Sequence, residues 1–249
     1  MAKLLVALAL LPAAAAFVGP TQTAAPATKV AETKADLESL AKSLNPAVGF
    51  WDPLNVAESR AVGETSEKTI AWYRQAEIKH GRVAMAAFVG YCVQANGFHW
   101  ATKMTLGGLD WPTGTPPEQW DALPVASKWQ IILFVGFLEF FSESGANGAH
   151  YTKGGKPGYY PPIAGRVGGQ ILFDLYDPFK WFPEQSAESK ARGLKAEILN
   201  GRAAMIGLMG FLSASSVPGS VPFLAGIEGF PKYSGNVMIP FEGDFTLFG

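Results

Sequence analysis

One charged segment occurs in two copies in this chain, and it constrains the fold more than any other feature. Residues 75–85 read QAEIKHGRVAM, and residues 195–205 read KAEILNGRAAM. The glutamate and the arginine are the same in both copies, whereas His80 stands opposite Asn200. The stretch that follows each copy is apolar and contains no charged residue. The repeat therefore predicts two long, largely apolar helices that each carry one glutamate and one arginine.

The spacing within each copy indicates that its charges pair between helices rather than within one helix. An α-helix turns by about 100° per residue, so residues five positions apart point about 140° away from each other. Glu77 and Arg82 are therefore poorly placed to pair within one helix, and the same holds for Glu197 and Arg202. If the two helices cross as a symmetric pair, Glu77 can meet Arg202, and Glu197 can meet Arg82. We expect each charge to be neutralised by the other copy.

Small residues follow the same duplicated pattern. Gly81 and Gly201, followed by Ala84 and Ala204, remove side-chain bulk where two crossing backbones would approach each other. Two solvated amphipathic helices with incidental charges are the alternative interpretation. That alternative fits poorly, because the sequence after each copy lacks a charged face.

Composition limits the class of protein. Charged residues make up 16% of the chain and hydrophobic residues 48%, whereas soluble domains carry about 25% charged residues. The net charge of −1 argues against a nucleic-acid partner. The single cysteine, Cys92, lies in an apolar stretch, which excludes an intramolecular disulfide and a cysteine-based metal site.

The first 35 residues are expected to be a targeting sequence. Lys3, an apolar run and the alanines at positions 13–16 predict a signal peptide over residues 1–16. Residues 17–35 are rich in Ala, Thr and Pro and resemble a plastid transit peptide. The combination resembles the two-part leader of plastids that are surrounded by more than two membranes. An ordinary secreted protein is the alternative, but paired cysteines are absent.

Residues 36–249 are expected to form one all-α domain with three transmembrane helices and short amphipathic segments. Apolar segments run over about 70–95, 126–141 and 196–217, and a membrane span takes about 20 residues. The outer two segments are long enough, whereas the middle one needs flanking residues to complete the span. A short polar helix is expected over residues 36–43.

Basic residues predict the orientation of the spans. The loop over residues 142–195 contains seven lysines and arginines, whereas residues 94–128 contain two and the tail after Val217 contains one. Basic loops stay on the side of the membrane that is not translocated. The N-terminus and the basic loop are therefore expected on the untranslocated side, which in a thylakoid membrane is the stroma.

An aromatic-Asp-Pro segment precedes each copy of the repeat. Trp51-Asp52-Pro53 lies before the first copy, and Tyr176-Asp177-Pro178 lies before the second. Each predicts an extended turn that places a carboxylate and an aromatic ring at the membrane boundary. Their duplication favours a symmetric role.

The polar residues of the predicted helices suit isolated ligands rather than a clustered metal centre. A di-iron carboxylate bundle uses two Glu-x-x-His motifs and two further glutamates; here Glu77 and His80 form one such motif, and Asn200 occupies the place of the second histidine. The magnesium of a chlorophyll needs only one axial protein ligand, because the macrocycle fills four positions. A His nitrogen, an Asn carbonyl or a Glu oxygen whose charge is cancelled by Arg can each serve.

The repeat is similar to the paired signatures of the three-helix light-harvesting chlorophyll-binding superfamily. These signatures are Glu-x-x-His-Gly-Arg-x-Ala-Met and Glu-x-x-Asn-Gly-Arg-x-Ala-Met, and both occur here. The aromatic-Asp-Pro segments also match, and the resemblance covers about residues 49–217. The resemblance implies that the first and third helices cross as a pseudo-two-fold pair. It also implies two carotenoids beside the crossed helices, with ends near Asp52 and Asp177.

The resemblance further implies which residues hold chlorophyll. The axial ligands of the chlorophyll magnesium would be Glu77, His80, Glu139, Glu197 and Asn200, and the neutralising cations Arg82 and Arg202. Two positions depart from plant members, which have glutamine where this chain has Ile131 and Ala214. Residues 154–159 and 233–241 look more like the chlorophyll a/c branch, especially the peridinin-type antennas of dinoflagellates.

The sequence therefore predicts a light-harvesting antenna and not an enzyme. Its cofactors would be chlorophyll a, chlorophyll c and carotenoids of the peridinin or fucoxanthin type and the diadinoxanthin type. Its partners would be a photosystem core, other antenna subunits and thylakoid lipids. Outside this family, the alternatives are a di-iron membrane oxidase and a pore or transporter. Within it, a photoprotective quencher would use carboxylates that face the lumen, namely Glu118, Asp121, Glu228, Glu242 and Asp244.

Overall fold

The computed structural model describes residues 32–144, 150–165, 171–175, 177–179, 181, 186–227, 230–237, 239–242 and 244. The predicted signal peptide and most of the predicted transit peptide lie outside these residues. The described part of the chain is helical and contains no strand, which confirms the all-α prediction for that part. Its elements, in chain order, are α3 (Lys34–Leu44), η1 (Val56–Glu58), α4 (Ser66–Ala95), α5 (Pro116–Asp121), α6 (Val125–Glu143), η2 (Tyr151–Lys153), α7 (Ala187–Ser216) and α8 (Pro222–Ala225).

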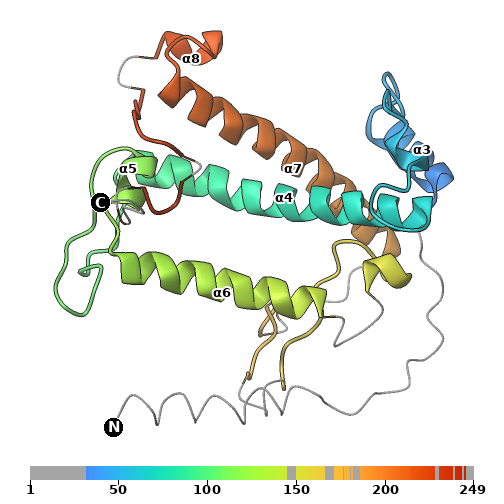
Figure 1. Cartoon of the computed structure of the whole chain (residues 1–249), viewed down its shortest axis with the longest axis horizontal. Coiled ribbons are helices and arrows are strands. Elements are labelled where there is room, and N and C mark those ends of the chain that lie inside the picture. Colours follow the sequence, from blue (N-terminus) through green and yellow to red (C-terminus); the bar gives the residue numbers. More distant parts are fainter. Residues whose placement is uncertain are drawn as a thin grey trace.

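The three long helices are α4, α6 and α7, and the outer two begin earlier than the apolar segments do (Figure 1). Thr65 caps α4, where its side chain accepts a hydrogen bond from the Lys68 amide. Ser186 caps α7 in the same way and accepts from the Ser189 amide. Such caps satisfy amide groups that have no partner in the first turn. The polar first turns are helical, but a search for apolar runs misses them.

Among the described helices, α6 and α7 are long and apolar enough to cross a membrane. Helix α4 is as long as α7, but Glu77, Lys79 and Arg82 interrupt its apolar sequence. Helix α6 exposes large apolar side chains around most of its circumference, including Leu133, Phe134, Val135, Phe137 and Phe140. A helix that is apolar on most of its surface is typical of a protein core or of a membrane span.

Helices α4 and α7 cross each other at the two glycines of the repeat (Figure 1). A Cβ atom on Gly201 would lie 2.9 Å from the Cα of Gly81, and a Cβ atom on Gly81 would lie 3.1 Å from the Cα of Gly201. The two backbones are therefore in contact, as the small residues predicted. The rings of Phe88 and Phe211 extend the packing, stacked with their centroids 5.0 Å apart.

Helix α6 lies alongside α4 (Figure 1). The C-terminal tail returns to the first turns of α6, where Asp244 contacts Lys128. Tyr233 is buried, and its hydroxyl donates to Asp121 Oδ2 over 2.7 Å. Burial and the contact with Asp121 raise the pKa of Tyr233 to about 12, so its hydroxyl remains a donor at neutral pH. The fully buried Lys128 ammonium contacts Asp244 Oδ2 at 2.5 Å and the Asp121 carbonyl at 3.1 Å.

Removing either partner of the Lys128–Asp244 pair should loosen the tail, but to different degrees. Asp244→Ala leaves a fully buried ammonium without its carboxylate, which costs about 3 kcal/mol. Lys128→Met leaves the partly exposed Asp244 carboxylate, which can turn to water, so we expect a smaller effect. Limited proteolysis should cut the tail of Asp244→Ala fastest. Lys232→Met, on the exposed part of the tail, is the control, and equal cleavage of all variants would contradict the prediction.

Candidate functional site

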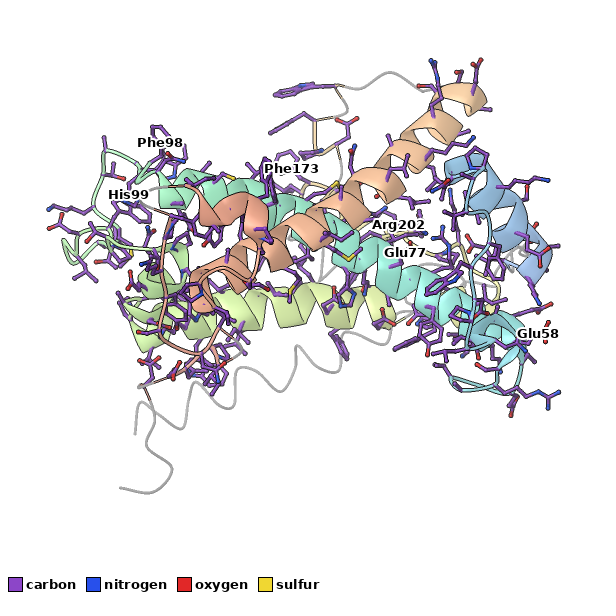
Figure 2. The ribbon with its side chains drawn as sticks, turned by 90° about the horizontal axis from the view of Figure 1, so that it is seen from above. Glu58, Glu77, Phe98, His99, Phe173 and Arg202 are labelled. Atoms are coloured by element: carbon purple, nitrogen blue, oxygen red, sulfur yellow. The ribbon has the colours of Figure 1, made fainter. Side chains whose placement is uncertain are left out.

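The two copies of the repeat meet where α4 and α7 cross, and their charges pair between the helices. Arg202 Nε and Nη2 lie 2.7 Å and 2.6 Å from Glu77 Oε1. Reciprocally, Arg82 Nε lies 2.5 Å from Glu197 Oε1. Figure 2 shows Glu77 and Arg202 together at the crossing. Both ion pairs expected from the sequence are therefore present.

The two ion pairs have different surroundings. Glu77 has a second cation, because the Arg74 guanidinium contacts Glu77 Oε2 from one turn earlier in the same helix. Arg74 is buried, and its Nε also contacts Glu32 Oε2 at 2.9 Å. The corresponding position of the second copy is Leu194. Sequence reasoning missed Arg74, although its i, i+3 spacing from Glu77 is a recognised pairing distance.

The second ion pair is linked to the loop before α7. Arg82 Nη1 donates to the Gly158 carbonyl over 2.6 Å, and the Gly158 amide donates to Gln75 Oε1 over 2.6 Å. Gly158 has a φ of 78°, and a Cβ atom there would lie 2.9 Å from Ile78 Cγ2. Only glycine fits this conformation and this close approach without strain. The loop therefore contacts α4 next to the crossing.

A cavity of about 370 Å³ lies between the Glu77–Arg202 pair and residues 37–51. Helix α3 lines one side with apolar side chains, and Phe50 and Trp51 line another. The wall also includes Arg74, Glu77 and Arg202. The cavity thus combines apolar surface with one neutralised carboxylate.

His80 and Asn200 lie on exposed surfaces of α4 and α7. The His80 Nδ1 atom lies 2.7 Å from the Ala76 carbonyl oxygen. A carbonyl oxygen only accepts, so in the neutral imidazole Nδ1 carries the proton and Nε2 keeps its lone pair. That nitrogen is the one that could coordinate a metal ion. The second copy offers the amide oxygen of Asn200 at the corresponding place.

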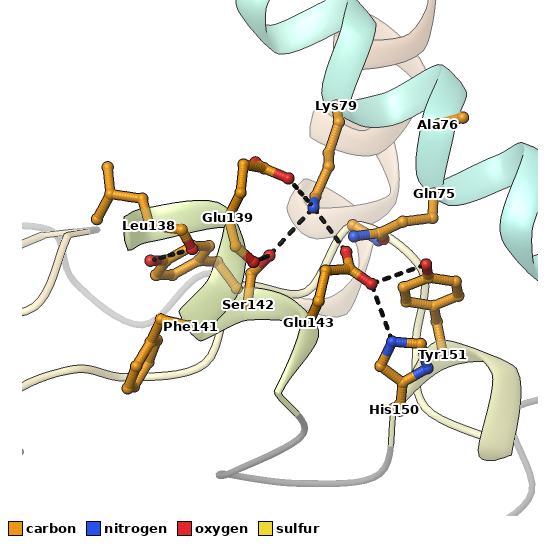
Figure 3. A network of polar contacts seen from close by, with 12 residues as sticks. Gln75, Ala76, Lys79, Leu138, Glu139, Phe141, Ser142, Glu143, His150 and Tyr151 are labelled. Carbon is orange, nitrogen blue, oxygen red and sulfur yellow. Dashed lines mark hydrogen bonds and ion pairs between the residues drawn. The ribbon is translucent and has the colours of Figure 1, made fainter. Parts of the chain in front are cut away.

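Glu139 lies on α6, away from the crossing of α4 and α7. Its side chain is 54% exposed, and Oε2 lies 2.7 Å from the Nζ atom of Lys79 on α4 (Figure 3). Three of the predicted carboxylates, Glu77, Glu197 and Glu139, thus each contact a cation from a different helix. Sequence reasoning missed Lys79, because neither copy of the repeat nor the spacing along α4 indicates a partner on α6.

The two aspartates of the aromatic-Asp-Pro segments cap turns. The Asp52 carboxylate accepts from the amides of Val56 at 2.9 Å and Ala57 at 2.8 Å. Asp177 Oδ1 accepts from the Trp181 amide over 2.8 Å. Both carboxylates therefore bind an amide four residues further along the chain. Tyr176 lies outside the described residues.

The described residues contain no group of three or more His, Cys, Asp or Glu side chains that could hold a metal ion. The clustered ligands that a di-iron centre requires are therefore not present in this part of the chain. The predicted chlorophyll ligands are distributed along three helices rather than gathered at one point.

Comparison with known proteins agrees with this arrangement. A family model described as chlorophyll A-B binding protein matches residues 36–216. The chain belongs to this family. A fucoxanthin-chlorophyll a-c binding protein from Trieres chinensis is 30% identical over 185 residues, which cover 72% of this chain and 79% of the relative. The resemblance noted in the sequence is thereby confirmed.

Two relatives from Phaeodactylum tricornutum cover more of the chain. Fucoxanthin-chlorophyll a-c binding protein B is 32% identical over 203 residues, which cover 80% of this chain and 88% of the relative. Protein F is 31% identical over 215 residues, which cover 84% of this chain and 93% of the relative. All three relatives are described as chloroplastic. They support the assignment to the chlorophyll a/c type of this family.

Proposed function

We propose that this protein is a light-harvesting antenna of a plastid thylakoid membrane that binds chlorophyll a, chlorophyll c and carotenoids. The observation that carries the proposal is the pair of reciprocal ion pairs at the crossing of α4 and α7. They bring two carboxylates into apolar helices and cancel their charges there. The fucoxanthin-chlorophyll a-c binding relatives support the choice of pigments.

The predicted ligands suit the magnesium of chlorophyll. In its neutral form, His80 offers the Nε2 lone pair on an exposed helix surface, and Asn200 offers a neutral amide oxygen. A carboxylate has about four lone-pair positions, so Glu77, Glu197 and Glu139 keep acceptor capacity after pairing with their cations. Magnesium prefers oxygen ligands. We propose these five residues as axial ligands, and Asp52 and Asp177 as the turns near the carotenoid ends.

The proposed topology has three spans, formed by α4, α6 and α7, with α4 and α7 related by a pseudo-two-fold axis. A lone charge at the centre of a span costs about 2.5 to 3.5 kcal/mol, and the contacts of α4 with Arg202, Glu197 and Glu139 offset this cost. A stromal N-terminus is supported by the many cations at one end of the helices, including Lys34, Lys42, Arg60, Lys68, Lys153, Lys156, Lys190 and Arg192.

The mechanism of an antenna is positional, and it requires no catalytic residue. When bound, chlorophylls and carotenoids absorb light and exchange excitation at rates that depend on their separation and orientation. The protein fixes both, because α4 and α7 are in backbone contact at Gly81 and Gly201. Rigid helices keep ligands such as His80 and Asn200 at constant positions. We propose a photosystem core, other antenna subunits and thylakoid lipids as partners.

His80→Leu and Asn200→Leu should each remove a discrete part of the bound chlorophyll. Each substitution deletes one proposed ligand at an exposed helix surface, so the fold should survive. Pigments are extracted from protein purified in mild detergent and separated by chromatography. Gln94→Leu, another exposed polar residue of α4, is the control and should keep the full pigment complement. Wild-type protein that carries iron and no chlorophyll would contradict the antenna proposal.

A further inference from the structure

Lys79 is the residue of the first repeat copy whose charge has no counterpart in the second, where Leu199 occupies its place. Its ammonium reaches from α4 to the last turns of α6 (Figure 3). It lies 2.7 Å from Glu139 Oε2, 2.8 Å from Glu143 Oε1 and 3.0 Å from Ser142 Oγ. Lys79 therefore uses all three of its donors on α6.

Glu139 depends on this contact for a counter-charge. The cation that α6 itself carries is Lys128, which lies eleven residues before Glu139, or about 16 Å along the helix axis. One turn further along α6, the neighbours of Glu139 are Ser142 and Glu143, which contact the same ammonium, and exposed apolar side chains such as Phe137 and Phe140 flank this face. Without Lys79, the Glu139 carboxylate would have no counter-charge and would lie beside the like charge of Glu143 at i+4, which is unfavourable on a helix. The charge of Glu139 is therefore tolerable because Lys79 cancels it.

Glu143 depends much less on Lys79 than Glu139 does. Its Oε2 atom lies 3.0 Å from His150 Nε2 and accepts from the Tyr151 hydroxyl over 2.9 Å. Burial and the Glu143 carboxylate raise the pKa of Tyr151 to about 12, so its hydroxyl remains a donor. Loss of Lys79 would leave Glu143 two partners, but in the described residues it would leave Glu139 without an ion-pair partner.

We propose that Lys79 is a positioning residue for the pigment on the middle helix. It neutralises Glu139 and fixes Oε2, which leaves Oε1 to coordinate magnesium. This inference rests on the proposed function, because it assumes that Glu139 is an axial ligand. It also gives the three carboxylate sites a common design, in which the counter-charge comes from a neighbouring helix: Arg202 for Glu77, Arg82 for Glu197 and Lys79 for Glu139.

The test compares the pigments of four variants, each produced as the mature chain and refolded with chlorophyll a, chlorophyll c and carotenoids in detergent. Glu139→Leu identifies the chlorophyll that belongs to the middle helix. Lys79→Met should lose the same chlorophyll, because Glu139 is left charged and unpaired. The double variant Lys79→Met/Glu139→Gln should regain it, because glutamine offers a neutral oxygen that needs no cation. Lys190→Met, an exposed lysine of α7, is the control and should match the wild type.

The outcomes separate the two proposals. If Glu139→Leu keeps all its chlorophyll, the ligand role of Glu139 is wrong. If Glu139→Leu loses a chlorophyll that Lys79→Met retains, the ligand role stands and the role of Lys79 is wrong. If Lys79→Met yields no pigmented protein, the double variant decides. Recovery there supports charge neutralisation, and failure shows that Lys79 acts on the fold by another route, which overturns the inference.

Discussion

Gly201→Leu should abolish the recovery of pigmented protein, because it forces apart the two backbones that carry the paired charges. A Cβ atom on Gly201 already lies 2.9 Å from the Cα of Gly81, and backbone cannot move aside as a side chain can. We expect the free energy of unfolding to fall by about 3 kcal/mol or more, which is a large fraction of the total stability of a typical domain. The yield of chlorophyll-binding protein after refolding measures the effect.

Gly210→Leu provides a matched control in the same helix. A Cβ atom on Gly210 has no atom within 4 Å, and the same holds for Gly90 at the corresponding position of α4. Both glycines therefore have space for a side chain, and leucine favours the helix more than glycine does. Equal yields for Gly201→Leu and Gly210→Leu would show that the backbone contact does not hold the helices together.

Arg82→Leu should damage the protein more than Arg202→Leu, although the two arginines occupy equivalent positions in the repeat. Arg82→Leu leaves Glu197 without a counter-charge in the described structure and also removes the hydrogen bond to the Gly158 carbonyl. Arg202→Leu leaves Glu77 with the buried Arg74. Breaking one partner of a fully buried ion pair costs about 3 to 5 kcal/mol of folding free energy. Because the side chains of Arg82 and Glu197 are 44% and 27% exposed, we expect a loss below that range for Arg82→Leu, and a markedly smaller one for Arg202→Leu.

The midpoint of thermal loss of the pigment circular-dichroism signal can rank the two variants. The double variant Arg82→Leu/Glu197→Gln removes both charges and should recover part of the loss. A double variant that is no more stable than Arg82→Leu would assign the effect to the Gly158 contact instead of the charge. Equal losses for Arg82→Leu and Arg202→Leu would show that Arg74 does not compensate for Arg202.

The crossed ion pairs could be predicted from the sequence because the repeat supplies them twice. One helix cannot pair Glu77 with Arg82, and duplication directs each charge to the other copy. Arg74 and Lys79 have no such duplicate, since Leu194 and Leu199 stand at the corresponding positions. A contact such as Lys79 with Glu139 joins residues 60 positions apart, and only the placement of α6 beside α4 reveals it.

Some helices can be recognised in the sequence by their capping residues, although the apolar pattern does not reveal them. Thr115 and Glu118 form a capping box at the start of α5 and accept hydrogen bonds from each other's amides. That Thr-x-x-Glu pattern, followed here by a short helix, is readable in the sequence. By contrast, the burial of Lys128 under the tail depends on how the chain returns, which composition does not indicate. The pigment ligands and the leader remain predictions.

The position at which the mature chain begins decides whether Arg74, which contacts Glu77, keeps its second carboxylate partner. Thr33 caps α3, and Glu32 contacts the buried Arg74 guanidinium. Both residues belong to the segment predicted as transit peptide, residues 17–35. The contacts favour a mature chain that retains Glu32, because its loss would remove a partner from a buried cation.

The two lysine contacts of α6 have a consequence for how this family can vary. Lys128 ties the first turn of α6 to the tail, and Lys79 ties its last turns to α4. The helix is thus held at its two ends, whereas the side chains between them face outward. The number of residues between Lys128 and Glu139 sets the separation of these attachments along the axis. Substitutions between them change what the helix surface binds, whereas an insertion would rotate and displace one attachment relative to the other.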